Sequence, residues 1–505
     1  MAQVVLVRPI YNTHIITPPI GLGYLSAYLK RQGIDVKIID ALKDGLNRET
    51  LVDRIVAERP EAVGITCMTS YYNEVVALSR ALKAEGVRVV LGGVHPTVLP
   101  ESTLKDSHCD FVILGESEIA LTKLVLSGFQ ANGIQGVYTL DTMGAYDGSN
   151  LSKAETVHDL DLIPFPDWPH MPPASYPKAP HGAIAKRYPI GVIVTSRGCP
   201  YECTFCASPM LCGRKIRFRS PANVVAEIRY LVEAFGVKEI HFEDDNLTLK
   251  RDHIAEICQL LIDQKIKISW ACPNGIRADR VDETLIALMR KSGCYYFAYG
   301  IESANPVILK NIKKRESIET ISRSIEMASK AGIACQGFFI FGLPGETPET
   351  IEETIRYACS SKLSRAQFLI LDVLPGSELW DALGGQFNPN WAKESYREPE
   401  WLPIELTEED LLSAQSRAFR KFYLQNPLRL LSLAASIRPG QLKYLVKRVF
   451  DYRLFASLRS NRLKTACPPR SIPQSLPQPQ GLVRRTRQPK SPQSQENVPF
   501  DISVL

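Results

Sequence analysis

The length, charge and cysteine usage of the chain limit the class of protein that it can be. Its 505 residues suffice for about three domains, and the 45% of hydrophobic residues can form sizeable cores. The net charge of +6 is mild, so no nucleic-acid partner is expected. Outside one cluster the twelve cysteines are scattered, many within apolar runs, which is typical of reduced thiols in a cytoplasmic protein. No signal-peptide layout and no apolar stretch of about 18 residues is found.

Strand and helix patterns alternate in residues 1–130. Strand patterns cover residues 4–7, 36–39, 62–66, 87–91 and 111–114, and helical patterns cover residues 21–31, 51–58 and 72–85. The alternation predicts a doubly wound, Rossmann-like parallel sheet, whose ligands bind at the carboxyl ends of the strands. Glycines at those ends let a bulky ligand approach the backbone. The candidate residues there are Thr69, Ser70, Gly92, Gly93, His95, Gly115 and Glu116.

A dinucleotide site is the main alternative for this domain. The run Gly21-Leu22-Gly23-Tyr24-Leu25-Ser26 approaches the G-x-G-x-x-G pattern, but it ends in Ser and begins well after the strand. That alternative is therefore discounted. Beyond this domain, residues 131–185 are expected to form a linker, because residues 164–180 are rich in proline, which removes backbone donors.

Three cysteines, Cys199, Cys203 and Cys206, follow a buried strand pattern at residues 190–196 with the spacing C-x3-C-x2-C. Thiolates are soft ligands that suit zinc, copper(I) or iron–sulfur clusters. Structural zinc sites and the common clusters need four ligands, so three cysteines leave one metal position open. The alternative is a structural zinc site with Cys212 as fourth ligand, but Cys212 lacks the paired spacing of zinc ribbons.

Six strand patterns alternate with helical patterns in residues 186–395. They lie at residues 192–195, 239–243, 269–272, 295–300, 334–341 and 366–373. The alternation suggests a partial (β/α)6 barrel of the TIM type, with its active site at the carboxyl ends of the strands. The candidate residues after those strands are Glu243, Asp244, Asp245, Arg277, Glu302, Ser303 and Gly342.

The cysteine motif, with Phe205 just before its third cysteine, resembles the signature of radical S-adenosylmethionine (SAM) enzymes. The first domain looks like the cobalamin-binding domain that precedes the catalytic domain in one large class of these enzymes. The matching pieces are residues 18–25, 66–71, 92–96 and 114–116, and the whole resemblance covers roughly residues 1–400.

The resemblance implies a 4Fe–4S cluster held by Cys199, Cys203 and Cys206, whose fourth iron is chelated by SAM. One electron from the cluster would cleave SAM to methionine and a 5′-deoxyadenosyl radical. The residues implied to bind SAM are Phe205, Glu243, Asp244, Asp245, Arg277, Glu302, Ser303 and Gly342: the acids after residue 242 would hold the amino group, Arg277 the carboxylate, Glu302 the ribose and Gly342 the adenine.

The same resemblance implies that Thr69, Ser70, Gly92, Gly93, His95, Gly115 and Glu116 line a cobalamin site. The chain departs from other cobalamin proteins in lacking the Asp-x-His-x-x-Gly motif whose histidine ligates cobalt. His14 lies in the corresponding loop without that context, and we expect His95 to line the site without ligating cobalt.

The implied function is an enzyme that methylates or otherwise modifies an unactivated carbon of a small-molecule, lipid or natural-product substrate. An electron donor such as flavodoxin or ferredoxin would serve it. One alternative is a degenerate cobalamin domain on an enzyme that catalyses cyclisation or rearrangement, and another is a non-catalytic cobalamin- or metal-binding module. A transfer-RNA methylthiotransferase is set aside, because only Cys67 and Cys109 lie in the first domain.

Residues 396–464 are expected to form a basic helical region. From residue 417 to residue 464, twelve Lys and Arg residues are opposed by Asp451 alone. Such a segment can lie as an amphipathic helix on an anionic membrane surface, and a helical cap with a solvated basic face is the simpler interpretation. Residues 465–505 are rich in Pro, Gln and Ser, which predicts a disordered tail.

Overall fold

The computed structural model describes residues 3–442, except residues 14, 145–150, 180, 385–386, 388, 390 and 392–398. The predictions made for His14, for the basic segment beyond residue 442 and for the tail therefore lie outside the described residues. The chain divides into two units, Met1–Leu454 and Phe455–Leu505, and every described residue belongs to the first unit.

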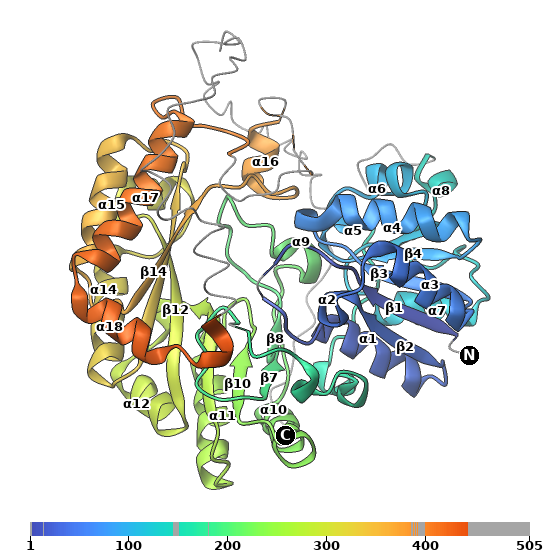
Figure 1. Ribbon diagram of the computed structural model, residues 1–505, viewed down its shortest axis with the longest axis horizontal. Coiled ribbons are helices and arrows are strands. Elements are labelled where there is room, and N and C mark those ends of the chain that lie inside the picture. The colour runs from blue at the N-terminus through green and yellow to red at the C-terminus, as the bar shows by residue number, and fades with distance from the viewer. Residues whose placement is uncertain are drawn as a thin grey trace, which may run out of the picture. The chain divides into compact units, whose positions relative to one another are not determined.

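The first sheet has the strand order β2-β1-β3-β4-β5-β6 (Figure 1). Its parallel strands are β1 (Val4–Arg8), β2 (Val36–Asp40), β3 (Ala62–Thr66), β4 (Val89–Gly92) and β5 (Phe111–Ile113). A short strand, β6 (Val137–Tyr138), runs antiparallel to β5. The predicted parallel sheet is confirmed, whereas β6 falls in the segment that was expected to be a linker.

Helices cover both faces of this sheet because side chains alternate along its strands. Val5 and Val7 of β1 pack with α3 (Arg48–Glu58) and α4 (Tyr72–Ala84). Val4 and Leu6 pack with α1 (Ile20–Arg31) and α7 (Glu118–Leu126) on the other face. The strand order reverses between β1 and β3, which is where doubly wound sheets bind ligands. The shorter helices are α2 (Ala41–Asp44), α5 (Val94–Val98), α6 (Pro100–Ser107) and α8 (Leu140–Gly144).

The second sheet is all parallel and has the order β14-β13-β12-β11-β10-β7 (Figure 1). Its strands are β7 (Ile190–Ile193), β10 (Glu239–Phe242), β11 (Ser269–Ile276), β12 (Cys294–Glu302), β13 (Ala334–Phe341) and β14 (Arg365–Ile370). Helices α10 (Pro221–Phe235), α11 (Arg251–Asp263), α12 (Glu283–Lys291), α14 (Ile318–Lys330) and α15 (Pro348–Ser360) connect them. Because β7 and β14 stand at opposite ends of the order, the sheet is an open, partial barrel, as predicted.

Local sequence signals set the ends of these helices. In α10 the Ser220 hydroxyl accepts a hydrogen bond from the backbone N–H of Asn223, and Pro221 occupies the first turn. Gly236 ends the helix with φ of +62°, a conformation that glycine adopts without strain. Between these ends, Val224 and Ile228 lie on the buried face, so α10 packs on the sheet.

Helix α17 (Glu408–Leu424) covers the outer edge of β14. The Gln415 side chain donates to the carbonyl of Phe368 at 2.9 Å. The Tyr423 hydroxyl accepts from the N–H of Ala366 at 3.1 Å and donates to its carbonyl at 3.0 Å. Side chains of this helix therefore satisfy backbone groups that a further strand would otherwise pair.

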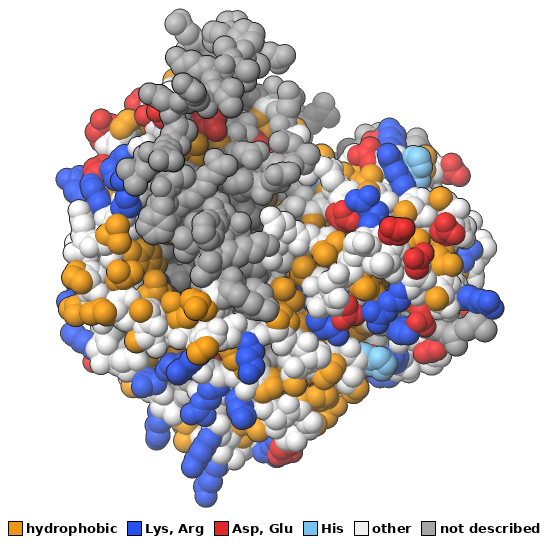
Figure 2. All heavy atoms as spheres, in the orientation of Figure 1, with side chains coloured by type: hydrophobic (Ala, Val, Ile, Leu, Met, Phe, Trp, Pro, Cys, Tyr) orange, Lys and Arg blue, Asp and Glu red, His pale blue; other side chains and the backbone are white. Residues whose placement is uncertain are grey.

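Helix α18 (Pro427–Ser436) follows α17 and has no buried residue. Leu424, Leu428 and Leu431 are each at least 60% exposed, and hydrophobic side chains gather over this region of the surface (Figure 2). The described part of the predicted basic region thus consists of the packed helix α17 followed by the exposed helix α18. None of the described helices is both long enough and apolar enough to cross a membrane. Two further helices, α13 (Pro306–Asn311) and α16 (Glu378–Ala382), lie after β12 and β14.

Candidate active site

The cysteine loop is closed by a small antiparallel ribbon, β8 (Ser196–Arg197) paired with β9 (Arg217–Phe218). Gly198 has φ of +102°, and a Cβ there would lie 2.8 Å from the carbonyl oxygen of Lys215, so the turn requires glycine. The N–H of Cys199 donates to the carbonyl of Gly213 at 3.2 Å. The base of the loop is therefore fixed before any metal binds.

The three thiols of the motif are free and partly exposed on this loop. The N–H of Ser208 donates to the sulfur of Cys206 at 3.5 Å. Burial raises the pKa of all three thiols, that of Cys206 to about 11, so a metal must displace their protons on binding. Three soft donors on one preformed loop fit an iron–sulfur cluster.

Cys212 differs from these three in its surroundings. It belongs to α9 (Pro209–Cys212), where burial and the carboxylate of Glu116 raise the pKa of its thiol to about 12. The guanidinium of Arg197 lowers that pKa by a smaller amount. Cys212 therefore lies beside charged residues of both domains.

A buried Lys–Glu pair lies close to the cysteines. The Lys314 ammonium contacts Glu302 at 3.0 Å and Glu316 at 3.8 Å. Glu302, the last residue of β12, has φ of +66°, which is uncommon for a residue with a side chain and is typical of functional positions. Burial raises the pKa of the Cys203 thiol, the charge of Lys314 lowers it and that of Glu302 raises it, so both charged groups act on this sulfur.

The three consecutive acids after β10 face different ways. Asp244 is buried and accepts from the backbone N–H and hydroxyl of Thr195 and from the hydroxyl of Ser196. Burial raises its pKa to about 6, although these hydrogen bonds lower it. Asp245 is exposed and accepts from the Ser208 hydroxyl at 2.6 Å. Glu243 and Asp245 line a cavity, whereas Asp244 holds the strand end that leads to the cysteine loop.

Arg277 follows β11, and its side chain is bonded to other residues of the protein. Its guanidinium contacts Asp279 at 2.9 Å, donates to the carbonyls of Lys314 at 3.1 Å and Arg315 at 2.9 Å, and lies over the Tyr201 ring at 3.7 Å. The implied contact of Arg277 with the SAM carboxylate thus stays a prediction. In this structure the side chain braces the cysteine loop through Tyr201.

The remaining residues implied to bind SAM lie outside the cavity lining. Ser303 is buried, with its hydroxyl 3.3 Å from that of Thr354. Gly342 has φ of +92°, and its N–H donates to Glu346 at 2.7 Å. Burial raises the pKa of Glu346 to about 8. Phe205 is partly buried against an apolar cluster that includes Ile308 and Leu343.

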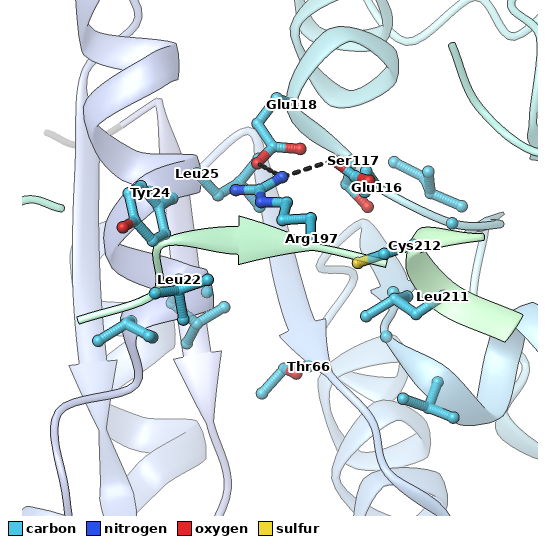
Figure 3. A pocket seen from close by; sticks show the side chains of 18 of the residues that line it. Leu22, Tyr24, Leu25, Thr66, Glu116, Ser117, Glu118, Arg197, Leu211 and Cys212 are labelled. Carbon is cyan, nitrogen blue, oxygen red and sulfur yellow. Dashed lines mark hydrogen bonds and ion pairs between the residues drawn. The ribbon is translucent and has the colours of Figure 1, made fainter. Parts of the chain in front are cut away.

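The cavity measures about 460 Å³ and is lined by residues of both domains (Figure 3). Gly92, Gly93 and Gly115 contribute no side chains to its wall, and a Cβ at Gly21 would meet no atom within 4 Å. Gly21, in the first turn of α1, therefore leaves open space in the wall, whereas the absent Cβ of Gly93 faces the backbone of Cys67. Other lining residues are Thr66, Glu116, Ser117 and Glu118 from the first domain, and Arg197, Ser208, Leu211, Cys212, Glu243 and Asp245 from the second.

Ion pairs join the two domains at this cavity. Arg197 contacts Glu116 at 2.5 Å and Glu118 at 2.8 Å (Figure 3). Arg217 also pairs with Glu116. Burial alone would lower the pKa of Arg197, but the two carboxylates hold it above its usual value. Glu116, implied to contact cobalamin, is thus already paired. Sequence reasoning missed both arginines, although Arg197 directly precedes the glycine and cysteine of the motif.

His95 was expected to line the cobalamin site, but it is not among the residues that line this cavity. A Cβ at Gly93 would lie 2.7 Å from the carbonyl oxygen of Cys67, and this close approach turns the chain into α5. His95 is therefore buried, stacked on Tyr72 at 3.9 Å, with its Nδ1 3.1 Å from the Thr69 hydroxyl. Burial lowers its pKa to about 4. Ser70, also a candidate, is exposed in the short 3-10 turn Thr69–Tyr71.

Family models agree with both domains. The radical SAM superfamily model matches residues 193–358, and the B12 binding domain model matches residues 11–125. The chain is 32% identical to an uncharacterized methyltransferase of Pyrococcus horikoshii over 88% of this chain and 93% of that protein. It is 29% identical to an anaerobic magnesium-protoporphyrin IX monomethyl ester cyclase of Rubrivivax gelatinosus over 87% of this chain and 80% of that protein.

A solved structure shares the fold. The radical SAM methyltransferase TsrM of Kitasatospora setae, with cobalamin and a [4Fe-4S] cluster bound, matches with a TM-score of 0.64 and 18% identity. The match covers 84% of this chain and 82% of that one. The chain belongs to the radical SAM enzymes that carry a cobalamin-binding domain.

Proposed function

We propose that this enzyme is a cobalamin-dependent methyltransferase that acts on an unactivated carbon of a small organic molecule. One observation carries the proposal: both domains line the same cavity. The cobalamin-binding domain contributes its glycine-bearing strand ends, and the second domain contributes residues beside the cysteine loop. In enzymes of this kind the cluster and SAM supply a radical and cobalamin carries the methyl group.

The chain's own residues would bind and orient these groups. Cys199, Cys203 and Cys206 would hold the cluster on the preformed loop. Glu243 and Asp245 line the cavity as acceptors suited to the ammonium of SAM. Glu302, held by Lys314, would accept from the ribose hydroxyls. Gly21, which lines the cavity and has open space at its Cβ position, would leave volume for the corrin or its nucleotide tail.

The choice of methyl transfer rests on the relatives. The methyltransferase of Pyrococcus horikoshii aligns with nearly the whole chain, which supports the same reaction type here. The cyclase of Rubrivivax gelatinosus aligns over a similar length, so oxidative cyclisation is the second candidate. A flavodoxin or ferredoxin would supply electrons in the cytoplasm. We place the second domain at residues 186–395, as the sequence indicated, and extend the first domain from residue 130 to residue 138, because β6 (Val137–Tyr138) pairs with β5.

Gly21→Phe tests the proposal, because Gly21 lines the cavity and has room for a side chain. Reduced protein is reconstituted with hydroxocobalamin, passed through gel filtration, and supplied with methyl-labelled SAM. Wild type should retain about one cobalamin and form labelled methylcobalamin, while Gly21→Phe should weaken retention at least about tenfold, since a phenyl ring occupies ligand volume. Gln32→Phe, at the exposed end of the same helix, is the matched control. Wild type that forms 5′-deoxyadenosine yet never retains cobalamin would contradict methyl transfer.

A further inference from the structure

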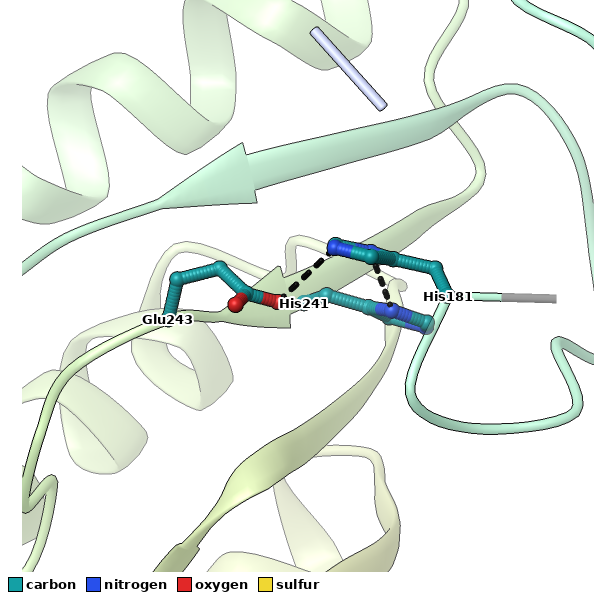
Figure 4. Close-up of side chains that lie close together, drawn as sticks. All are labelled: His181, His241 and Glu243. Atoms are coloured by element: carbon teal, nitrogen blue, oxygen red, sulfur yellow. Dashed lines mark hydrogen bonds and ion pairs between the residues drawn. The ribbon is translucent and has the colours of Figure 1, made fainter. Parts of the chain in front are cut away.

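Two histidines and a carboxylate converge beside β10, apart from the cysteine loop. His241 lies on β10, Glu243 follows that strand, and His181 lies on the segment before β7 (Figure 4). One potential ligand atom from each residue lies within 4.8 Å of the others. The side chain of His241 is 0% exposed, that of His181 7% and that of Glu243 18%, so the group is largely shielded from water.

The hydrogen bonds around Glu239 fix the tautomer of His241. Glu239 is fully buried and accepts from the backbone N–H groups of Lys186 at 2.9 Å and Arg187 at 2.8 Å, and from the Tyr295 hydroxyl at 2.6 Å. The Nε2 of His241 lies 2.9 Å from the same carboxylate, so it carries the proton and donates. Its other ring nitrogen, Nδ1, faces His181 and no carboxylate, so the lone pair there is the one available to a ligand.

The other ring nitrogens lie close to one another and to Glu243. Nδ1 of His181 lies 2.9 Å from Nδ1 of His241, and Nε2 of His181 lies 3.0 Å from Oε1 of Glu243. That oxygen is buried and has no hydrogen-bond donor among the described residues. Nitrogen and oxygen atoms that carry lone pairs therefore converge on one buried site, an arrangement that a cation stabilises.

We propose that His181, His241 and Glu243 bind a divalent transition-metal ion, separate from the cluster. Two imidazole nitrogens and one carboxylate oxygen form a donor set that zinc accepts, and three protein ligands leave a position for water or another oxygen donor. A cation there would give Oε1 of Glu243 the partner that this oxygen lacks among the described residues.

The surroundings match those of a metal site. A ligating histidine usually donates its other ring N–H to a carboxylate, and Glu239 fills that role for His241. The ion also has routes of entry, because Glu243 lines the cavity described above and His181 lines a second cavity of about 250 Å³. The metal-site proposal can be tested independently of methyl transfer, because the experiment measures the bound metal itself.

Zinc is the probe, since it binds nitrogen and oxygen sites more tightly than iron(II) does. The full chain with its cluster is washed with chelator, equilibrated with Zn²⁺ under anaerobic conditions and separated from free metal. Mass spectrometry should find about one zinc per chain. Zinc-edge X-ray absorption should show nitrogen and oxygen ligands at about 2.0–2.2 Å, including imidazole, and no sulfur at about 2.3 Å.

Substitutions then assign the ligands. His241→Ala should abolish stoichiometric zinc, and Glu239→Gln should weaken its affinity about 10–100-fold by loosening the imidazole. His253→Ala is the matched control, because it removes another buried histidine, which bonds to the carbonyl of Arg219, and should leave zinc bound. Wild type that retains no zinc, or that holds it through sulfur, would overturn the proposal without reference to any variant.

Discussion

Arg197 is the residue whose removal should most clearly loosen the two domains from each other. It reaches from the ribbon beside the cysteine loop to Glu116 and Glu118 of the cobalamin-binding domain. Their side chains are 4% and 8% exposed, so both carboxylates depend on a partner for their charge. Arg197→Met keeps most of the side-chain volume and removes the charge.

The expected cost follows from which charges stay paired. Glu116 retains Arg217, but Glu118 loses its contact with Arg197. Breaking a buried pair by removing one partner costs about 3–5 kcal/mol, and we expect the lower end because Arg217 remains. About 3 kcal/mol is roughly a 150-fold change in the ratio of folded to unfolded protein. Adding Glu118→Gln should recover at least about 1 kcal/mol, because it removes the unpaired charge.

Urea unfolding under anaerobic conditions measures this effect. Circular dichroism and tryptophan fluorescence are followed together, because a chain with two domains can unfold in more than one step. Arg251→Met is the control: it breaks an ion pair with Asp282 in which both side chains are about half exposed, and should cost under about 1 kcal/mol. If Arg197→Met costs no more than this control, the ion pairs do not hold the domains together.

Two further predictions concern the cluster and pH. Protein purified under anaerobic conditions should hold about four irons per chain, and replacing Cys199, Cys203 or Cys206 by Ala should abolish iron binding. Cys212→Ala should retain the iron. Iron analysis and visible absorption measure both outcomes. Burial raises the pKa of Glu346 to about 8, against about 4.3 when unfolded, so the folded state keeps a proton that the unfolded state has lost. The free energy of unfolding should therefore fall as the pH rises from about 4.5 to 8, and Glu346→Gln should remove this fall. Urea unfolding at several pH values measures it, and the same pH dependence in wild type and variant would contradict the prediction.

Local patterns were enough to predict the architecture of both sheets. The strand and helix patterns of residues 4–114 and of residues 192–373 are confirmed, because each element has its own apolar periodicity and turn signals. The cysteine loop was also predictable, since its ligands lie within eight residues. The ribbon formed by β8 and β9 was not, because its two-residue strands are too short to leave a pattern.

Side-chain partners were beyond local reasoning. Asp244 and Arg277 lie after strands, as predicted, but their partners are Thr195, 49 residues away, and the carbonyl of Arg315, 38 residues away. Glu116 pairs with Arg197 across 81 residues and two domains. Nothing in the spacing of single motifs reveals such contacts, since the order of elements in space decides them.

The covered edge of β14 has a consequence for the folding of the chain during synthesis. An open barrel leaves a strand whose backbone groups could pair with another molecule, and such edges are templates for aggregation. Gln415 and Tyr423 of α17, which are 47 and 57 residues further along the chain than their partners, occupy those groups. During synthesis the strand leaves the ribosome before its cover does, so the nascent enzyme passes through an interval in which this edge is exposed to neighbours.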